Sequence, residues 1–257
     1  MKKNYINKRK KNFLSINIYI TLSFILIIFI FVYFFFNYRL IIRTTLNFVE
    51  KYSNNYQYNL TEIKISHLNF LHEKEILKYF DSYKGKSIFL ISLKKISNEI
   101  HENKWVKNIY IKSNYKNILN VTIKEELPLG IYNNNNQRIL FSNDLVVLDI
   151  LDNNSKFNNL ITFYGSNSLN NSKKLFLNLE NNFKQFVESA TYIGNRRWNL
   201  KLKNQIILKL PENNIKEAIK KYNNIYANIS SKDLKDIKSI DLRINNKAII
   251  KYKDKLN

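Results

Sequence analysis

An uncharged segment near the N-terminus most constrains what this chain can fold into. Residues 12–38 read NFLSINIYITLSFILIIFIFVYFFFNY and contain no charged side chain. About 20 apolar residues in a helix cross the ~30 Å hydrocarbon core of a membrane. A signal peptide has a shorter apolar region that ends in a small-residue cleavage site, and the first alanine of this chain is Ala190. The sequence therefore predicts an uncleaved transmembrane helix over residues 12–38.

The charges that flank this segment predict its orientation. The tail 1–11 carries six basic residues and no acidic one, whereas Arg39 and Arg43 alone stand close to the far end. Positively charged flanks stay in the cytoplasm. We therefore expect a cytoplasmic basic tail over residues 1–11 and a single-pass, type II protein whose remaining residues lie outside the membrane.

The overall charge favours anionic partners without pointing to nucleic acid. The formal net charge is +22, and removing the six basic residues of the tail leaves 36 basic against 20 acidic residues, a formal +16. Clustered basic residues would indicate phosphate binding, but here they are spread along the chain. Lys, Asn, Ile, Tyr and Phe abound while glycine numbers 4 and proline 2, the bias of an A/T-rich genome. We expect no nucleic-acid partner, and without cysteine there is no disulfide framework.

A first folded unit is predicted after a juxtamembrane linker over residues 39–57, which begins as a helix. Apolar residues alternate over 63–65, recur at helical spacing over 72–83 and 92–103, and alternate again over 104–113 and 117–128. The order strand, helix, helix, strand, strand describes a compact α+β unit over residues 58–127. We expect Phe80 and Trp105 to be largely buried in it.

The remaining chain is richer in strands. We expect an antiparallel β domain with flanking helices over residues 128–253, followed by a tail over 254–257. Helices are predicted over 173–193 and 213–230, the first from apolar residues that recur every three or four positions. The predicted strands cover 129–134, 138–144, 145–150, a hairpin within 194–212, and then 237–244 and 247–253.

Residue patterns that carry catalysis are missing. The GKS at 85–87 resembles the end of a phosphate-binding loop, but Phe80 stands where that motif needs a glycine. The three histidines lack metal-ligand spacing, and Glu125 and Glu126 occupy successive strand positions that face opposite ways. No serine lies in a nucleophile elbow. We therefore expect no catalytic residue, no metal site and no cofactor, so that the protein is not an enzyme.

Two longer motifs resemble those of one bacterial family. The stretch KWVKNIYIKSNYKNILNVTIKEELPLGIY is similar to a signature of the FtsQ/DivIB cell-division family. Its matching positions are Trp105, Val106, Leu119, Glu125 and Pro128. GNRRWNLKLKNQIILKLPE at 194–212 and IDLR at 240–243 resemble segments of its alphaproteobacterial members.

The chain also departs from the family pattern. Lys104 stands in place of proline, Glu126 in place of arginine, and Tyr115 with Lys116 in place of Trp-Pro. Gln205 replaces a turn glycine, and we expect a less tight turn there.

The resemblance implies an architecture and a role. It implies a short cytoplasmic tail, one membrane helix, a POTRA domain and a C-terminal β domain. It further implies a scaffold of the divisome in the inner membrane at the septum, with its folded domains in the periplasm. The scaffold would bind the FtsB/FtsL subcomplex and help to recruit and regulate the septal peptidoglycan synthase, indirectly FtsW/FtsI. Two alternatives remain open: a membrane-anchored envelope enzyme that acts on peptidoglycan, and a POTRA protein of a transport assembly.

Two segments are candidates for the partner surface. Residues 244–253 alternate as an edge strand would, and a free edge can accept an extended partner segment. In the hairpin segment, Trp198 is expected to face the core, whereas Arg196 and Arg197 either brace a chain corner or meet the partner. The candidate partner-binding residues are Arg196, Arg197, Ile244, Asn246, Lys247, Ile250, Lys251 and Tyr252.

Overall fold

The computed structural model describes residues 3–134, 137–152, 155–245 and 247–253. They divide into two compact units. One comprises Met1–His67, His72–Glu99 and Tyr110–Thr122, and the other comprises Leu68–Leu71, Ile100–Ile109 and Ile123–Asn257. The expected α+β fold class, with a long N-terminal apolar helix, is confirmed.

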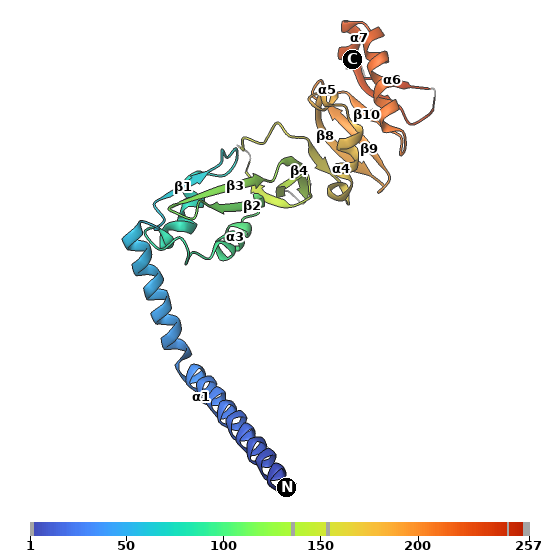
Figure 1. Ribbon diagram of the computed structural model, residues 1–257. Coiled ribbons are helices and arrows are strands. Elements are labelled where there is room, and N and C mark those ends of the chain that lie inside the picture. The colour runs from blue at the N-terminus through green and yellow to red at the C-terminus, as the bar shows by residue number, and fades with distance from the viewer. Residues whose placement is uncertain (1–2, 135–136, 153–154, 246, 254–257) are drawn as a thin grey trace. The chain divides into compact units, whose positions relative to one another are not determined.

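A single helix, α1 (Lys3–Tyr56), begins the first unit and is drawn in blue at the start of the chain (Figure 1). Its portion Ile18–Tyr56 is, among the described residues, the one helix long and apolar enough to cross a membrane. These 39 residues extend about 59 Å, roughly twice the ~30 Å hydrocarbon core. The segment 39–57, expected to be a linker that begins as a helix, is helical to Tyr56.

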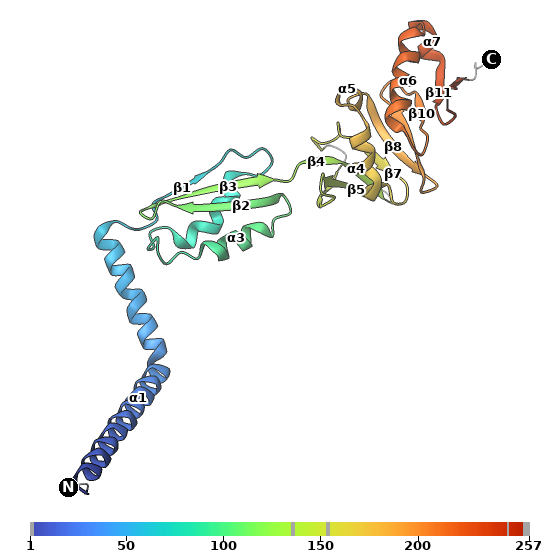
Figure 2. The ribbon, with the colours of Figure 1, turned by 45° about the vertical axis from the view of Figure 1, so that its right-hand side comes forward.

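The first sheet has three strands in the order β1-β3-β2, with helices beside it (Figure 2). Its elements are β1 (Glu62–Ile65), α2 (Glu73–Leu77), a 3-10 helix η1 (Lys78–Tyr83), α3 (Leu93–His101), β2 (Val106–Ser113) and β3 (Ile118–Glu125). The predicted order of strands and helices is confirmed. Strand β1 runs parallel to β3, with Glu62 opposite Ile118. Phe80 is fully buried, as expected.

The end of α1 is anchored in the loop that contains the GKS sequence. The hydroxyls of Ser53 and Ser87 lie 2.6 Å apart and are buried. The backbone N–H of Ser87 also points at the Glu50 carboxylate, at 3.3 and 3.4 Å. Gly85, with φ of +77°, donates its N–H to the Leu60 carbonyl. The loop with the GKS sequence thus holds the end of α1, and Gly85 serves this loop conformation rather than the binding of a phosphate.

We predict that Ser87→Ala lowers the free energy of unfolding by ~1–3 kcal/mol, because it leaves the buried Ser53 hydroxyl without a partner. The double variant Ser53→Ala/Ser87→Ala should recover part of that loss, since no buried hydroxyl is then unpaired. Thermal unfolding of the full chain in detergent micelles measures both, with exposed Ser82→Ala as a control. Additive losses in the double variant would show that the two hydroxyls do not depend on each other.

The second unit contains one nine-stranded sheet, in the order β12-β11-β10-β9-β8-β7-β4-β5-β6. Its strands are β4 (Pro128–Asn134), β5 (Gln137–Ser142), β6 (Val147–Leu151), β7 (Thr162–Tyr164), β8 (Val187–Ile193), β9 (Arg197–Leu202), β10 (Ile207–Lys209), β11 (Ile237–Asp241) and β12 (Ile249–Tyr252). Its helices are α4 (Ser168–Asn178), α5 (Asn181–Lys184), α6 (Ile215–Asn228) and α7 (Ser231–Asp236).

The pairing in this sheet is mixed, which corrects the expected antiparallel arrangement. Strand β7 lies parallel to β4 and to β8, and β10 lies parallel to β11. Parallel neighbours need a crossover connection, and the helices α4 and α5 supply one from β7 to β8, as α6 and α7 do from β10 to β11. The expected helix over 173–193 was wrong in its last third. That part is β8, because its residues pair with both β7 and β9.

The sheet has apolar clusters on both faces. The larger one lies beneath the helices and includes Trp198 and Leu200, which are 4% and 0% exposed, so the expected inward orientation of Trp198 is confirmed. On the other face, over β4 to β6, a smaller cluster forms around Ile131. Trp105 packs against this smaller cluster and is only half-buried. The expectation that Trp105 is largely buried in the first unit was therefore wrong.

Trp105 is held there by other aromatic rings rather than by aliphatic side chains. Its ring centroid lies 5.2 Å from that of Phe70 and 5.8 Å from that of Phe157. Aromatic pairs at such separations add to the free energy gained from burial alone. The stack ties the chain around residues 68–71 and 100–109 to the second unit.

A carboxylate clamp secures the same region. Glu125 is 8% exposed, and its Oε2 accepts the N–H of Asn69 at 2.7 Å. Its Oε1 accepts the N–H groups of Phe70 at 2.9 Å and Leu71 at 2.8 Å. Burial by itself raises the pKa of Glu125, but the backbone hydrogen bonds outweigh it and hold the pKa below its usual value. Glu125 is therefore a structural anion rather than a free acid.

We predict that Glu125→Gln lowers the free energy of unfolding by ~2 kcal/mol near neutral pH, because an amide offers one acceptor oxygen to three donors. Because the pKa of Glu125 is lower in the folded than in the unfolded protein, its charge stabilises the fold at pH values above the ordinary pKa of 4.5. This stabilisation is lost as the pH falls through the pKa of the folded state. The difference in free energy of unfolding between wild type and variant should therefore become smaller below pH 4.5. Unfolding at several pH values measures it, with exposed Glu62→Gln as a control. A gap independent of pH would contradict the charged clamp.

Candidate partner-binding surface

The C-terminal strand β12 lies at one end of the nine-stranded sheet. It pairs with β11, with Ile250 opposite Ile240 and Ile249 opposite Asp241. Ile250 packs against the core beneath the helices, whereas Ile249 is 54% exposed on the other face. This alternation agrees with the periodicity of the sequence, and β12, like β6 at the other end of the described sheet, has one neighbouring strand.

The end of β12 is fastened to helix α7. The backbone N–H of Lys253 donates to the Asp236 carbonyl at 2.7 Å, and its Nζ donates to the Lys235 carbonyl at 2.7 Å. A cation at a helix C-terminus satisfies carbonyls that lack an intrahelical partner. The strand is thereby held in the sheet at its C-terminal end without a second neighbouring strand.

The predicted residues of this segment are exposed to different degrees. Ile244 and Lys247 are exposed in the turn before β12, and the Lys247 N–H donates to the Ile244 carbonyl at 3.3 Å. Lys251 is exposed, and Tyr252 is 51% exposed. Asn246 lies outside the described residues.

The two arginines lie at the turn between β8 and β9. Arg196 is exposed, and its Nε lies 3.5 Å from a carboxylate oxygen of Glu212. Both side chains of this pair are more than half exposed, so the pair contributes little to stability. Arg197 is the first residue of β9 and is half-buried.

The register of the strands places Arg197 and Lys251 on the same face of the sheet. Leu200, Leu208, Ile240 and Ile250 stand opposite one another across four strands and point to the core. Successive side chains of a strand alternate between the two faces, so the side chains of Arg197 and Lys251 lie on the face opposite to this core. Strands β9 and β12 are three strand spacings apart, about 14 Å. Ile250 is on the opposite face, so the predicted residues do not form one patch.

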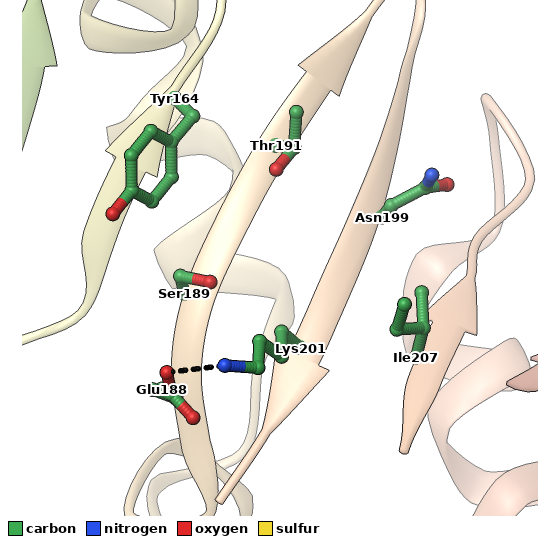
Figure 3. Close-up of a pocket in the computed structure, with 7 residues that line it drawn as sticks. All are labelled: Tyr164, Glu188, Ser189, Thr191, Asn199, Lys201 and Ile207. Atoms are coloured by element: carbon green, nitrogen blue, oxygen red, sulfur yellow. Dashed lines mark hydrogen bonds and ion pairs between the residues drawn. The ribbon is translucent and has the colours of Figure 1, made fainter. Parts of the chain in front are cut away.

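The face of the sheet opposite to the helices, called the open face below, has a hollow over strands β7 to β10 (Figure 3). The hollow has a volume of about 420 Å³. It is lined by Tyr164, Glu188, Ser189, Thr191, Asn199, Lys201 and Ile207. Sequence reasoning missed this surface, because the short strand β7 that borders it carries too few residues for a period to show.

The hollow contains one ion pair. Lys201 Nζ donates to Glu188 Oε1 at 2.7 Å, and the Gln205 side chain donates to Glu188 Oε2 at 3.3 Å. Both carboxylate oxygens are thus occupied, and no other acidic residue and no histidine lines the hollow. Among the described residues there is also no group of three or more metal-ligating side chains. The surface has the chemistry of a polar binding face.

One further contact fixes the end of β11 near the turn into β12. Arg243 Nε lies 2.8 and 2.9 Å from the two carboxylate oxygens of Asp241. The hydrogen bond with Arg243 lowers the pKa of Asp241 and outweighs the effect of burial. Both residues belong to the IDLR motif at 240–243, but nothing in the sequence indicated that they form an ion pair.

Comparison with known proteins gives two family matches that together span most of the chain. A family model of the FtsQ-type POTRA domain matches residues 58–126. A model of the C-terminal region of the cell division proteins FtsQ/DivIB matches residues 130–243.

Individual relatives agree with these matches. The cell division protein FtsQ of Rickettsia felis is 33% identical over 184 residues, which cover 69% of this chain and 66% of the relative. The Rickettsia conorii protein of the same name has the same identity and coverage. The Rhizobium meliloti protein is 22% identical over 196 residues, 74% of this chain and 62% of the relative. The chain thus spans just under two thirds of the length of the relatives it matches.

Proposed function

Because the chain belongs to the FtsQ/DivIB family of cell-division proteins, we propose that it is a single-pass scaffold of the division machinery and not an enzyme. The observation that carries the proposal is the terminal strand β12, with one neighbouring strand and with exposed lysines at 247 and 251. A strand with a free edge can pair with a segment of another chain. The proposed work of the protein is therefore binding.

The proposed partner is the FtsB/FtsL subcomplex, which would add an extended segment to β12. Backbone hydrogen bonds would supply affinity, and the side chains of Lys251 and Tyr252 would select the segment. Lysines on an edge strand also oppose edge-to-edge aggregation, which suits a strand that waits for a partner. Through this contact the protein would help to recruit and regulate the septal peptidoglycan synthase, FtsW/FtsI.

The competing proposal, a peptidoglycan-acting enzyme, has less support. An acid/base mechanism needs groups that converge on one substrate atom. In the hollow of the open sheet face, Glu188 already accepts hydrogen bonds on both oxygens, and no second acid lines the site. This geometry favours a binding role.

We further propose the following division of the chain: a cytoplasmic tail over 1–11, a membrane span over 12–38, a juxtamembrane segment over 39–57, a POTRA domain over 58–127, a β domain over 128–253 and a tail over 254–257. The two family matches, at 58–126 and 130–243, support the limits of the two folded domains. The compact units have other limits, because Trp105 and Glu125 make their contacts within the second unit.

We propose that the protein lies in the inner membrane at the septum. We predict that its N-terminus is cytoplasmic and its folded domains are periplasmic, because the basic residues next to the apolar segment are concentrated in the tail. A reporter active only in the periplasm, fused after Asn257, should be active. A reporter active only in the cytoplasm should be silent at the same position. The reverse pattern would rule out the proposed orientation and with it the periplasmic partner.

We predict that Lys251→Glu and Tyr252→Ala each weaken binding of the FtsB/FtsL subcomplex about tenfold, because both alter the edge strand and neither side chain is in the core. The matched control is Lys209→Glu, which makes the same charge change on the same sheet face but in the interior strand β10. Titration of the full chain in micelles with the purified subcomplex measures the affinities. Full binding by both β12 variants, together with a loss in the control, would move the partner surface to the open face around Arg197.

A further inference from the structure

A second hollow lies on the helix-covered side of the sheet. It has a volume of about 320 Å³ and is formed by residues of α5 and the segment after it, the end of β9 and the turn that follows, and α6. Its lining residues are Phe183, Phe186, Leu202, Lys203, Asn204, Tyr222, Asn223 and Tyr226. Leu202 belongs to the core beneath the helices, so this hollow is on the face opposite to Lys201 and to the open face.

The hollow has a rigid aromatic floor. Phe183 and Tyr222 are 3% and 5% exposed, and their rings meet edge to face with centroids 5.8 Å apart. Tyr226 continues this group, 5.6 Å from Tyr222. Burial, together with Tyr226, raises the pKa of Tyr222 to about 12, although a hydrogen bond with Asn204 opposes the rise. The Tyr222 hydroxyl therefore stays uncharged at the base of the hollow.

The walls of the hollow are aromatic but exposed. Phe186 is 54% exposed and Tyr226 is 41% exposed. The Phe186 backbone is held in place, since its carbonyl accepts the N–H of Lys203 at 2.9 Å. Exposed aromatic rings around a pre-formed apolar hollow are typical of sites that bury a side chain of a partner.

The hollow has one exposed cation and no acidic residue in its lining. Lys203 is the one lining residue with a charged side chain, and it is exposed at the mouth. An occupant that carries negative charge beside an apolar group would complement this rim.

We propose that this hollow is a second docking site, for an acidic protein segment that inserts one leucine or phenylalanine side chain between Phe186 and Tyr226. The apolar side chain would rest on the aromatic floor, and an acidic neighbour in the segment would pair with Lys203. Interfaces concentrate binding energy in such buried anchors, with charged groups at the rim. The site does not depend on β12 and would let the domain hold a second partner segment.

The test uses the full chain in detergent micelles and a fluorescent peptide, acetyl-Glu-Asp-Leu-Phe-Glu-Asp-amide. We expect it to bind at least about tenfold more tightly than a peptide with lysines in place of its acids, or with alanines in place of Leu-Phe. Phe186→Ala and Lys203→Glu should each weaken its binding about tenfold. Because both side chains are exposed at the rim, neither change should unfold the protein, which thermal unfolding checks.

Matched controls separate this site from the rest of the protein. Leu177→Ala removes an apolar side chain that is 77% exposed elsewhere, and Lys209→Glu reverses a charge on the other sheet face. Neither should change the affinity, and Lys251→Glu should leave it unchanged while it weakens FtsB/FtsL binding. The proposal is overturned if the alanine peptide binds as tightly as the Leu-Phe peptide, or if the controls weaken peptide binding as much as the site variants. It is also overturned if Phe186→Ala weakens binding of the protein to anionic lipid vesicles but leaves peptide binding unchanged.

Discussion

A row of aliphatic side chains across four strands holds the C-terminal edge of the sheet in place. Leu200, Leu208, Ile240 and Ile250 stand opposite one another and point to the core beneath the helices. A slip of one residue in any of these strands would turn its apolar set toward solvent. The register of β12, and hence the exposure of Lys251, follows from this row. Both proposed docking sites depend on it, one at the end of the sheet and the other through Leu202 in β9.

Local periodicity was sufficient to predict the elements whose burial is regular along the chain. The absence of charge over 12–38 indicated a long apolar helix, and the alternation around Ile250 indicated a strand with one buried face. It failed at 187–193, where helical spacing of apolar residues hid a strand. That strand exists because β7 and β9 lie on either side of it, and neither neighbour can be inferred from the segment alone.

Long-range packing explains the other differences. Trp105 was expected in the core of the first unit, but its partners Phe70 and Phe157 are 35 and 52 residues away along the chain, and no local pattern links the three. The placement of Arg197 on the open face also needed the strand order. Gln205 was expected to loosen the turn after β9. Instead it adopts φ of +71°, and its N–H donates to the Leu202 carbonyl at 2.8 Å, so the turn is closed by a hydrogen bond although the residue is not glycine.

The unbroken helix α1 has a mechanical consequence. A flexible linker lets a folded domain sample a wide volume, whereas an α-helix rises by a fixed distance per residue. The turns between Tyr38 and Tyr56 span about 27 Å, and the buried contact between Ser53 and Ser87 joins their end to the first unit. The first sheet is therefore connected to the apolar segment by continuous helical turns rather than by a flexible linker, so a change in the tilt of those turns would act directly on the loop that contains Ser87.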